Sequence, residues 1–413
     1  MSKVISEEVS LPELLAPAGD PEKLATALHF GADAVYVGGE RFGLRAMAGN
    51  FTLPQLEQAR RLTRRRGKKL YLTLNAYLAP EDFPELRNYV EELRPLDIDA
   101  YIVSDPGIIT LIREVDPRRP LHLSTQANTT NAAAAVFWQK NGIRRVNLGR
   151  ELSLQQIKAI RAGCDLELEA FVHGAMCMAY SGRCLLSAAL TGRSANRGAC
   201  THPCRWGYAL VEETRPGQYF PIEEDGGGAY ILNSRDLCLI DHLEALIGAG
   251  LDCLKIEGRM KSRYYVAVVT DVYRNALDHL GAGRQEDRNS SRRRAELETV
   301  SHRPYGSGFL FPEAGGQIHP PFSSYIRSYD FVGVLVENPA GFPLVQVRNR
   351  FFPGEILELV APGMERISFS PAKIRTAAGD FLPVAQPNAV VAIDLPAQGK
   401  PGDLLRRKKT PAS

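Results

Sequence analysis

The sequence predicts an α/β protein: a (β/α)₈ TIM-type barrel with a long cysteine-rich insertion between strands 7 and 8, followed by a small C-terminal antiparallel β-barrel domain. Three observations predict this fold. Eight short apolar runs alternate with helical periodicity before residue 260, about 80 residues separate the last two runs, and β-type runs broken by proline and glycine follow residue 325. Crossover helices force neighbouring strands to be parallel, and eight strand–helix units suffice to close a barrel.

The barrel strands are expected at the eight apolar runs, in chain order. They are Glu13–Pro17, Ala34–Val37, Leu70–Leu74, Ala100–Val103, Leu121–Ser124, Val146–Leu148, Leu166–Phe171 and Cys253–Ile256. Helices are expected between them, for example at Pro21–Gly31, Leu53–Arg66, Phe83–Leu93 and Leu154–Ala162. A doubly wound open sheet is the alternative. The glycine fingerprint of a dinucleotide-binding fold is absent after the first strand, which favours the barrel.

We expect two domains. The barrel domain takes residues 1–320, with the insertion at about 173–252, and the C-terminal domain takes residues 325–405. The strands expected in the second domain are Phe331–Val336, Leu344–Val347, Glu355–Leu359 and Val390–Ile393. Because long loops after barrel strands lie on the catalytic face, the insertion is the first place to expect function. The polar, arginine-rich segment 281–294 is interpreted as an exposed connection.

Composition is that of an ordinary globular protein, with 44% hydrophobic and 23% charged residues and a net charge of +3. Short basic runs occur at 64–66, 292–294 and 406–409. They are either solvated surface or phosphate contacts, and for RNA binding we expect the helix around Arg64 and the tail from Arg406 to Lys409 to contribute. No apolar stretch reaches eighteen residues and the N-terminus is polar, so we expect a cytoplasmic protein with no membrane contact and reduced thiols.

Five of the seven cysteines lie in the insertion, which is difficult to explain by packing. They are Cys177, Cys184, Cys200, Cys204 and Cys238. Thiolate-rich sites suit zinc or iron–sulfur clusters, and only the pair at 200 and 204 has the short spacing of a zinc ribbon. The irregular spacing favours an iron–sulfur cluster, with zinc or a redox dithiol as alternatives. Cys164 and Cys253 fit ordinary buried positions instead.

Several segments resemble the peptidase U32 (collagenase-like) family, in order along nearly the whole chain. They are residues 15–19, 169–187, 196–205, 233–238, 255–261 and 302–309. The second begins Glu-Ala-Phe-Val-His-Gly-Ala-Met-Cys, and the fifth reads Lys-Ile-Glu-Gly-Arg-Met-Lys. The C-terminal β-type unit is part of the resemblance.

The resemblance implies an RNA-modifying enzyme more than a protease. Members of the family install hydroxyl groups on RNA or on quinone precursors, and several carry a [4Fe–4S] cluster. The implied ligands here are Cys177, Cys184, Cys200 and Cys238, with Cys204 as the alternative to Cys200. The branch with the appended C-terminal domain is similar to enzymes that form 5-hydroxyuridine at the wobble position of tRNA with prephenate as co-substrate. Whether a protein partner of the same family is required stays open.

The expected barrel rim supplies charged groups for such chemistry. Glu169 and His173 are expected to leave strand 7, and Glu257 and Arg259 to leave strand 8, as acid–base groups and an anion clamp. Prephenate is a dicarboxylate, so cations are expected near it. The candidates are Arg45, Arg150, Arg197, Arg205 and Arg259. Alternatively, the charged residues pair with other rim residues. His122 is interpreted as an interior histidine, while His202 is either a ligand or a loop residue.

Two other functions remain as alternatives. A cysteine protease would use Cys177 with His173, although a nucleophile among four other cysteines invites metal binding; the helical His-Glu-x-x-His of a metalloprotease is absent. A non-catalytic RNA-binding protein would use the C-terminal β-barrel as its platform. The aromatic residues available there are Tyr325, Phe331, Phe351 and Phe352.

Overall fold

The computed structural model describes the barrel and the C-terminal unit almost completely and the insertion in part. The described residues are 11–44, 49–176, 186–193, 200–201, 210–211, 219–220, 224–225, 228–229, 235–283, 290–311, 325–339, 341–396 and 399–409. No helix within these ranges is long and apolar enough to cross a membrane.

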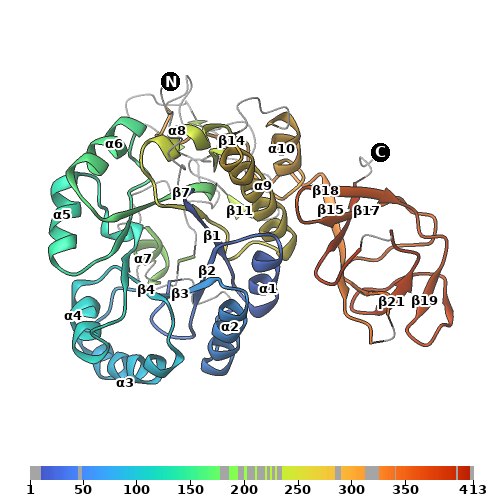
Figure 1. Ribbon diagram of the computed structural model, residues 1–413, viewed down its shortest axis with the longest axis horizontal. Helices are drawn as coiled ribbons and strands as arrows, with labels where there is room; N and C mark the ends of the chain where they lie inside the picture. Colours follow the sequence, from blue (N-terminus) through green and yellow to red (C-terminus); the bar gives the residue numbers. More distant parts are fainter. Residues whose placement is uncertain are drawn as a thin grey trace, which may run out of the picture.

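Eight parallel strands close into a barrel, which confirms the predicted fold class (Figure 1). The strands are β1 (Glu13–Pro17), β2 (Ala34–Gly38), β3 (Lys69–Leu74), β4 (Ala100–Val103), β5 (Leu121–Leu123), β6 (Arg145–Asn147), β7 (Glu167–Ala175) and β13 (Cys253–Ile256). The barrel closes because β13 pairs with β1 on one side and with β7 on the other. Each strand lies where an apolar run predicted it, but β7 continues four residues beyond its expected end.

Helices follow the strands and cover the outside of the barrel (Figure 1). They are α1 (Pro21–His29), α2 (Leu53–Arg65), α3 (Phe83–Leu93), α4 (Pro106–Val115), α5 (Ala132–Lys140), α6 (Leu154–Gly163), α8 (Leu243–Gly248) and α9 (Arg263–Gly281). Most begin at a capping side chain. Thr52 and Ser153, for example, accept a hydrogen bond from the third backbone amide of their helices, and the glutamine side chain at that third position accepts one from the backbone amide of the capping residue. Since the first amides of a helix have no carbonyl partner, these caps fix where each helix starts.

Alternation along the strands divides the core into two layers. Residues such as Val35, Leu72 and Leu168 face the helices in the main hydrophobic cluster. The alternate positions face the barrel axis, where Leu15, Tyr36, Tyr71, Ile102 and Cys253 belong to a separate interior cluster. The interior is therefore filled by side chains rather than open, as is usual for such barrels.

The insertion lies between β7 and β13, as predicted, and it returns to the strand from which it left. Its last part, β12 (Asp236–Cys238), pairs antiparallel with the end of β7, so that Cys238 is opposite His173. β14 (Tyr305–Gly306) extends the same sheet beyond β12. The described parts of the insertion also contain α7 (Leu186–Thr191) and the short strands β8 (Leu210–Val211), β9 (Tyr219–Phe220), β10 (Glu224–Asp225) and β11 (Gly228–Ala229).

The C-terminal unit is an eight-stranded antiparallel sheet with its own hydrophobic cluster. Its strands are β15 (Tyr329–Val336), β16 (Leu344–Val347), β17 (Leu357–Ala361), β18 (Glu365–Phe369), β19 (Ile374–Thr376), β20 (Phe381–Leu382), β21 (Val390–Ile393) and β22 (Leu404–Lys408). The order is β18-β17-β22-β15-β16-β21-β19-β20. The last strand in sequence thus lies inside the sheet, between β17 and β15.

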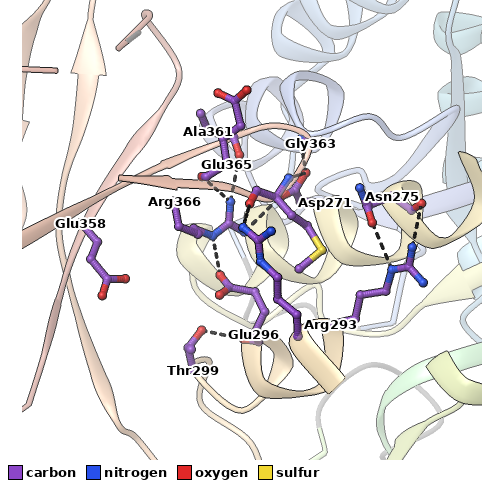
Figure 2. A network of polar contacts seen from close by, with 12 residues as sticks. Asp271, Asn275, Arg293, Glu296, Thr299, Glu358, Ala361, Gly363, Glu365 and Arg366 are labelled. Carbon is purple, nitrogen blue, oxygen red and sulfur yellow. Dashed lines mark hydrogen bonds and ion pairs between the residues drawn. The ribbon is translucent and has the colours of Figure 1, made fainter. Parts of the chain in front are cut away.

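A buried network of ion pairs joins this sheet to the barrel (Figure 2). Arg366 on β18 contacts Asp271 of α9 at 2.9 Å and Glu296 of α10 (Ser290–Leu297) at 2.6 Å. Glu296 also accepts two bonds from Arg406, at 2.6 and 3.1 Å, and Arg406 bonds Glu358 at 2.7 Å. Burial favours the neutral acid, but Arg366 and Arg406 outweigh it and hold the pKa of Glu296 below its ordinary value.

Two predictions about basic segments are wrong in part. Part of 281–294 is not an exposed connection, because α10 begins at Ser290 and Arg293 is buried against Asn275, to which it donates a bond of 3.0 Å. Arg406 is not a free phosphate contact, because β22 is an inner strand and the guanidinium is only 3% exposed. Arg64 does stay exposed, with a contact to Asp97 at 2.7 Å.

Candidate functional site

The carboxyl ends of the strands form a polar mouth. On one side, the carboxamides of Asn75 and Gln126 bond at 2.7 Å, and Ser124 donates to the same Gln126 oxygen at 2.5 Å. Ser104 bonds the Asn75 carbonyl at 3.0 Å. These residues follow β3, β4 and β5, so three neighbouring strands bring amides and hydroxyls to one place. In barrel enzymes this face is where substrates bind.

Arg259 crosses the mouth from the end of β13. Its guanidinium donates to Thr73 at 3.1 Å, to the Leu44 carbonyl at 2.8 Å and to Asn50 at 3.0 Å. Gly38 makes this position possible, because a Cβ there would lie 2.5 Å from a guanidinium nitrogen. The predicted anion clamp thus donates to three neutral oxygens near the end of β2, and Arg259 is 5% exposed.

Arg150 lies on the other side of the barrel, after β6. It donates to the Ala175 carbonyl at the end of β7 at 2.8 Å, and its guanidinium carbon lies 4.0 Å from the centre of the Phe171 ring. Arg150 and Arg259 therefore approach the mouth from different strands. A ligand with two anionic groups would suit this arrangement, because arginine forks match carboxylates.

Glu169 does not lie at the rim, where the sequence placed it. It faces the barrel interior from within β7, where its Oε1 contacts the Lys255 ammonium at 2.7 Å and its Oε2 is 3.6 Å from Arg145. The prediction is wrong because Glu169 lies inside β7, which continues to Ala175, so the residue is well before the carboxyl end of the strand. Lys255 lies 4.6 Å from the centre of the Tyr36 ring, so the interior holds a buried cation between an acid and an aromatic ring.

A second group of charged side chains lies in the barrel interior next to Glu169 and Lys255. Arg145 contacts Glu13 at 2.6 Å, and Tyr71 donates to the same carboxylate at 2.9 Å. Burial raises the pKa of Glu13, but Arg145 and Lys69 outweigh it, so the net shift is downward. We did not predict the roles of Arg145, Lys255 and Glu13 from the sequence, although their polar character at alternate positions of apolar strands was the available signal.

Three inward side chains on neighbouring strands have polar atoms with no hydrogen-bond partner among the described residues. They are His122 Nδ1 on β5, both amide atoms of Asn147 on β6, and Glu169 Oε2 on β7. All three residues are at most 5% exposed. Because buried polar groups are nearly always paired, this part of the interior is suited to water or a polar ligand atom. His122 is interior as predicted, but its Nδ1 has no hydrogen-bond partner among the described residues.

His173 faces away from the barrel axis into a box of tyrosines. Its ring nitrogens lie 3.5 Å from the hydroxyls of Tyr273 and Tyr305, and it is 1% exposed. A change of register between β7 and β13 just before His173 turns its side chain outward. Burial lowers the pKa of His173 to about 3. The imidazole is therefore neutral and enclosed, which does not support the predicted acid–base role.

Glu257 remains at the rim, directly after β13. Its backbone amide donates to the His173 carbonyl at 2.8 Å, and Tyr265 donates to its carbonyl at 2.9 Å. The side chain is half-buried and lines a cavity of about 540 Å³ between the barrel and the C-terminal sheet. Of the four predicted catalytic residues, Glu257 and Arg259 are thus at the catalytic face.

The predicted cluster ligands are described only in part. Cys238 is a buried free thiol at the end of β12, and Cys200 is a half-buried free thiol in the insertion. Burial raises the pKa of the Cys238 thiol to about 11, so a thiolate there needs a cation such as iron to stabilise it. Within the described ranges no group of three or more metal-binding side chains occurs. Two unbridged thiols provide the donor type that an iron–sulfur cluster takes.

Several predicted residues lie outside the described residues. They are Arg45, Cys177, Cys184, Arg197, His202, Cys204 and Arg205.

The fold and the mouth define the chain as a (β/α)₈-barrel protein with a polar site at the carboxyl end of the strands and a cysteine-bearing insertion beside it. Comparison with known protein families identifies both domains. The chain belongs to peptidase family U32, whose model matches residues 19–319, and the model of the U32 C-terminal domain matches residues 327–406.

Curated relatives match along most of their length. The chain is 38% identical to tRNA hydroxylation protein P of Escherichia coli (strain K12), covering 91% of each chain. It is 36% identical to tRNA hydroxylation protein P1 of Bacillus subtilis (strain 168), covering 96% of this chain and 95% of that protein. It is also 34% identical to a collagenase of Porphyromonas gingivalis (strain ATCC BAA-308 / W83), covering 78% of this chain and 79% of that protein.

Proposed function

We propose that this chain is an RNA-modifying hydroxylase that converts the wobble uridine of tRNA to 5-hydroxyuridine, with prephenate as co-substrate and a [4Fe–4S] cluster as cofactor. The observation that carries the proposal is the match to tRNA hydroxylation proteins over more than nine-tenths of both chains, C-terminal unit included. In this proposal the enzyme works in the cytoplasm on soluble tRNA.

The polar mouth is the proposed substrate site. Arg259 and Arg150 would each bind one carboxylate of prephenate, because they reach the mouth from different strands. Arg45, Arg197 and Arg205 remain proposed contributors. The amide and hydroxyl groups around Gln126 would orient the rest of the molecule.

Proton handling would fall to Glu257, the one predicted acid that is half-buried at the catalytic face. Glu169 would act indirectly, by holding the Lys255 ammonium between the Tyr36 and Phe171 rings below the mouth. The Lys255 charge would then attract an anionic co-substrate into the barrel.

Cys177, Cys184, Cys200 and Cys238 would hold the cluster, with Cys204 as the alternative to Cys200. Such a cluster supplies electron transfer, or an iron with an open position for an oxygen-bearing molecule. Its place in the chain suits this use, because β12 joins the Cys238 end of the insertion to β7 at the catalytic face.

Hydroxylation of another RNA or of a quinone precursor stays as an alternative, and so does a peptidase. The collagenase relative favours the last. Against it, His173 is 1% exposed and its ring nitrogens face two tyrosine hydroxyls, so it is poorly placed to serve as the base for a cysteine nucleophile acting on an accessible peptide.

The test is an anaerobic purification followed by iron and sulfide assays. The protein is then incubated with an unmodified tRNA transcript, with and without prephenate, and the nucleosides are analysed by mass spectrometry. We expect about four irons and four sulfides and 5-hydroxyuridine only with prephenate. Cys238→Ser should lose both cluster and product, whereas Cys164→Ser, a buried thiol outside the insertion, should keep both. A metal-free protein that modifies no tRNA but cleaves gelatin would reject the proposal.

A further inference from the structure

A groove separates the barrel from the C-terminal sheet at the catalytic face. We call it the interdomain groove: the cavity of about 540 Å³ lined by the loop 257–262, the start of α9, and residues 325–331 at the start of the C-terminal unit. Glu257 and Gly258 in its wall directly follow β13, so the groove opens beside the proposed substrate site. Its volume is within the range of about 300–1,000 Å³ typical of small-molecule sites.

Two cations in this groove are held without any carboxylate. The Lys261 ammonium lies 4.3 Å from the centre of the Tyr325 ring and 5.3 Å from that of Tyr265, and it donates to the Ser301 carbonyl at 3.2 Å. The Arg327 guanidinium donates to the Ser301 hydroxyl at 3.3 Å. No acidic group of the described residues lies within 4.0 Å of either cation, unlike most of the arginines on the barrel surface.

These contacts position positive charge without neutralising it. An aromatic face and a carbonyl oxygen orient an ammonium, but neither carries a full negative charge. A third cation, Lys409, reaches the groove from the end of β22 and is only loosely paired with Asp330, at 3.5 Å. The groove is thus lined by three cations, Lys261, Arg327 and Lys409, and by two acids, Glu257 and Asp330. The excess of positive charge favours an anion, and Tyr329 and Phe331 add ring surface to the wall.

The walls of the groove are fixed relative to each other. Arg366 joins Asp271 of α9 and Glu296 of α10 to the C-terminal sheet through buried charge-assisted bonds (Figure 2). Arg406 on β22 adds a second bond to Glu296. Binding to a preorganised groove costs less conformational entropy than binding to a flexible one. The C-terminal unit thus has a structural role that the barrel alone does not provide.

We propose that the interdomain groove binds the backbone of an unpaired stretch of the substrate RNA, next to the base that enters the barrel mouth. This inference rests on the proposed function and names the surface that function requires. Uncompensated cations beside aromatic rings are the combination used by sites for single-stranded nucleic acid, where cations contact phosphates and rings stack on bases. Lys261 and Arg327 contact the phosphates.

The test compares two matched double variants of the cluster-bearing full chain. Lys261→Gln with Arg327→Gln removes the groove cations. Lys373→Gln with Arg375→Gln removes two cations that also lie over an aromatic ring, that of Phe381, at 5.6 and 4.5 Å. These lie at β19, on the side of the sheet away from the barrel (Figure 1). Binding of an unmodified tRNA transcript is measured by fluorescence anisotropy from 50 to 200 mM salt.

We expect the groove variant to bind tRNA at least tenfold more weakly, with a slope of log affinity against log salt that is smaller by about 1.4, or about 0.7 for each lost phosphate contact. The control variant should stay within twofold of the wild type. Unfolding midpoints measured in parallel show that both variants are folded. Equal loss in both variants, or wild-type binding by the groove variant, overturns the groove inference and leaves the proposed function intact.

Because the binding assay needs no turnover, it distinguishes a failure of the groove inference from a failure of the proposed reaction. A wild-type chain that binds tRNA through the groove but forms no 5-hydroxyuridine would contradict the proposed reaction and support the groove. A wild-type chain that binds no RNA at any of these salt concentrations overturns the groove inference together with the proposed function.

Discussion

Replacing Arg406 by leucine tests how the C-terminal sheet is attached. The guanidinium is 3% exposed and donates to Glu296, Glu358, Tyr264 and Thr299 at 2.6 to 3.1 Å. Removing one partner of a buried ion pair leaves the other charge uncompensated, which costs about 3–5 kcal/mol. Arg366 still contacts Glu296, so we expect the lower part of this range, about 3 kcal/mol.

The assay is urea unfolding followed by two signals. Both tryptophans of the sequence precede residue 320, so their fluorescence reports on the barrel domain, whereas far-ultraviolet circular dichroism reports on both domains. In the variant, the C-terminal sheet should unfold at lower urea than the barrel, and the two transitions should separate. The control is Arg375→Leu, whose exposed cation contacts only a ring, with an expected change within about 0.5 kcal/mol. Coincident transitions and a loss below about 1 kcal/mol would refute the reasoning.

Three further predictions follow from single positions. Gly38→Ala should reduce hydroxylation at least tenfold with an unfolding free energy within about 1 kcal/mol of the wild type, because the new Cβ displaces the Arg259 guanidinium; Gly248→Ala, which meets no atom within 4 Å, should keep full activity. Burial, with nearby cations, lowers the pKa of His122 well below its ordinary value, so the unfolded chain binds a proton that the folded chain does not, and stability falls as the pH drops below about 6.5. Between pH 6 and 5, the free energy of unfolding should fall less steeply in His122→Phe than in the wild type, by up to about 1.4 kcal/mol per pH unit. An unchanged dependence on pH in urea unfolding would contradict this. Gly174→Ala should destabilise the chain by about 2 kcal/mol or more in the same assay, because its φ of +108° and a carbonyl oxygen 2.7 Å from the new Cβ both oppose a side chain. A neutral result would show that the end of β7 relaxes around the new side chain.

The barrel could be predicted because its strands are short buried runs that alternate with segments of helical periodicity. The apolar run at Val146, for instance, is a local feature that tertiary structure does not override. The interior charges could not be predicted in the same way. Arg145 and Lys255 look like ordinary polar positions of alternating strands, and only closure of the barrel brings them to Glu13 and Glu169.

The outer parts of the site show where local reading fails. The sequence predicts His173 at the rim. In the structure, a change of register between β7 and β13, for which the sequence has no signal, turns His173 toward tyrosines of α9 and β14. Arg406 looked like part of a basic tail, because its role depends on β22 entering the middle of a sheet. Lys261 and Arg327 were not predicted either, since they are 66 residues apart and meet only through the packing of two domains.

The position of β22 has a consequence for assembly. β22 lies between β15 and β17 and pairs with both, although it is the last strand of the sheet in sequence. The two strands are therefore joined only when β22 is in place. Pairing between segments that are distant in sequence is slow, because the intervening loop must first be closed. Arg406 is carried by that strand, so only a sheet that has completed its pairing presents the guanidinium to Glu296. A C-terminal unit in which β22 is unpaired therefore lacks one of the two arginines that bond Glu296, so complete docking onto the barrel requires a completed sheet.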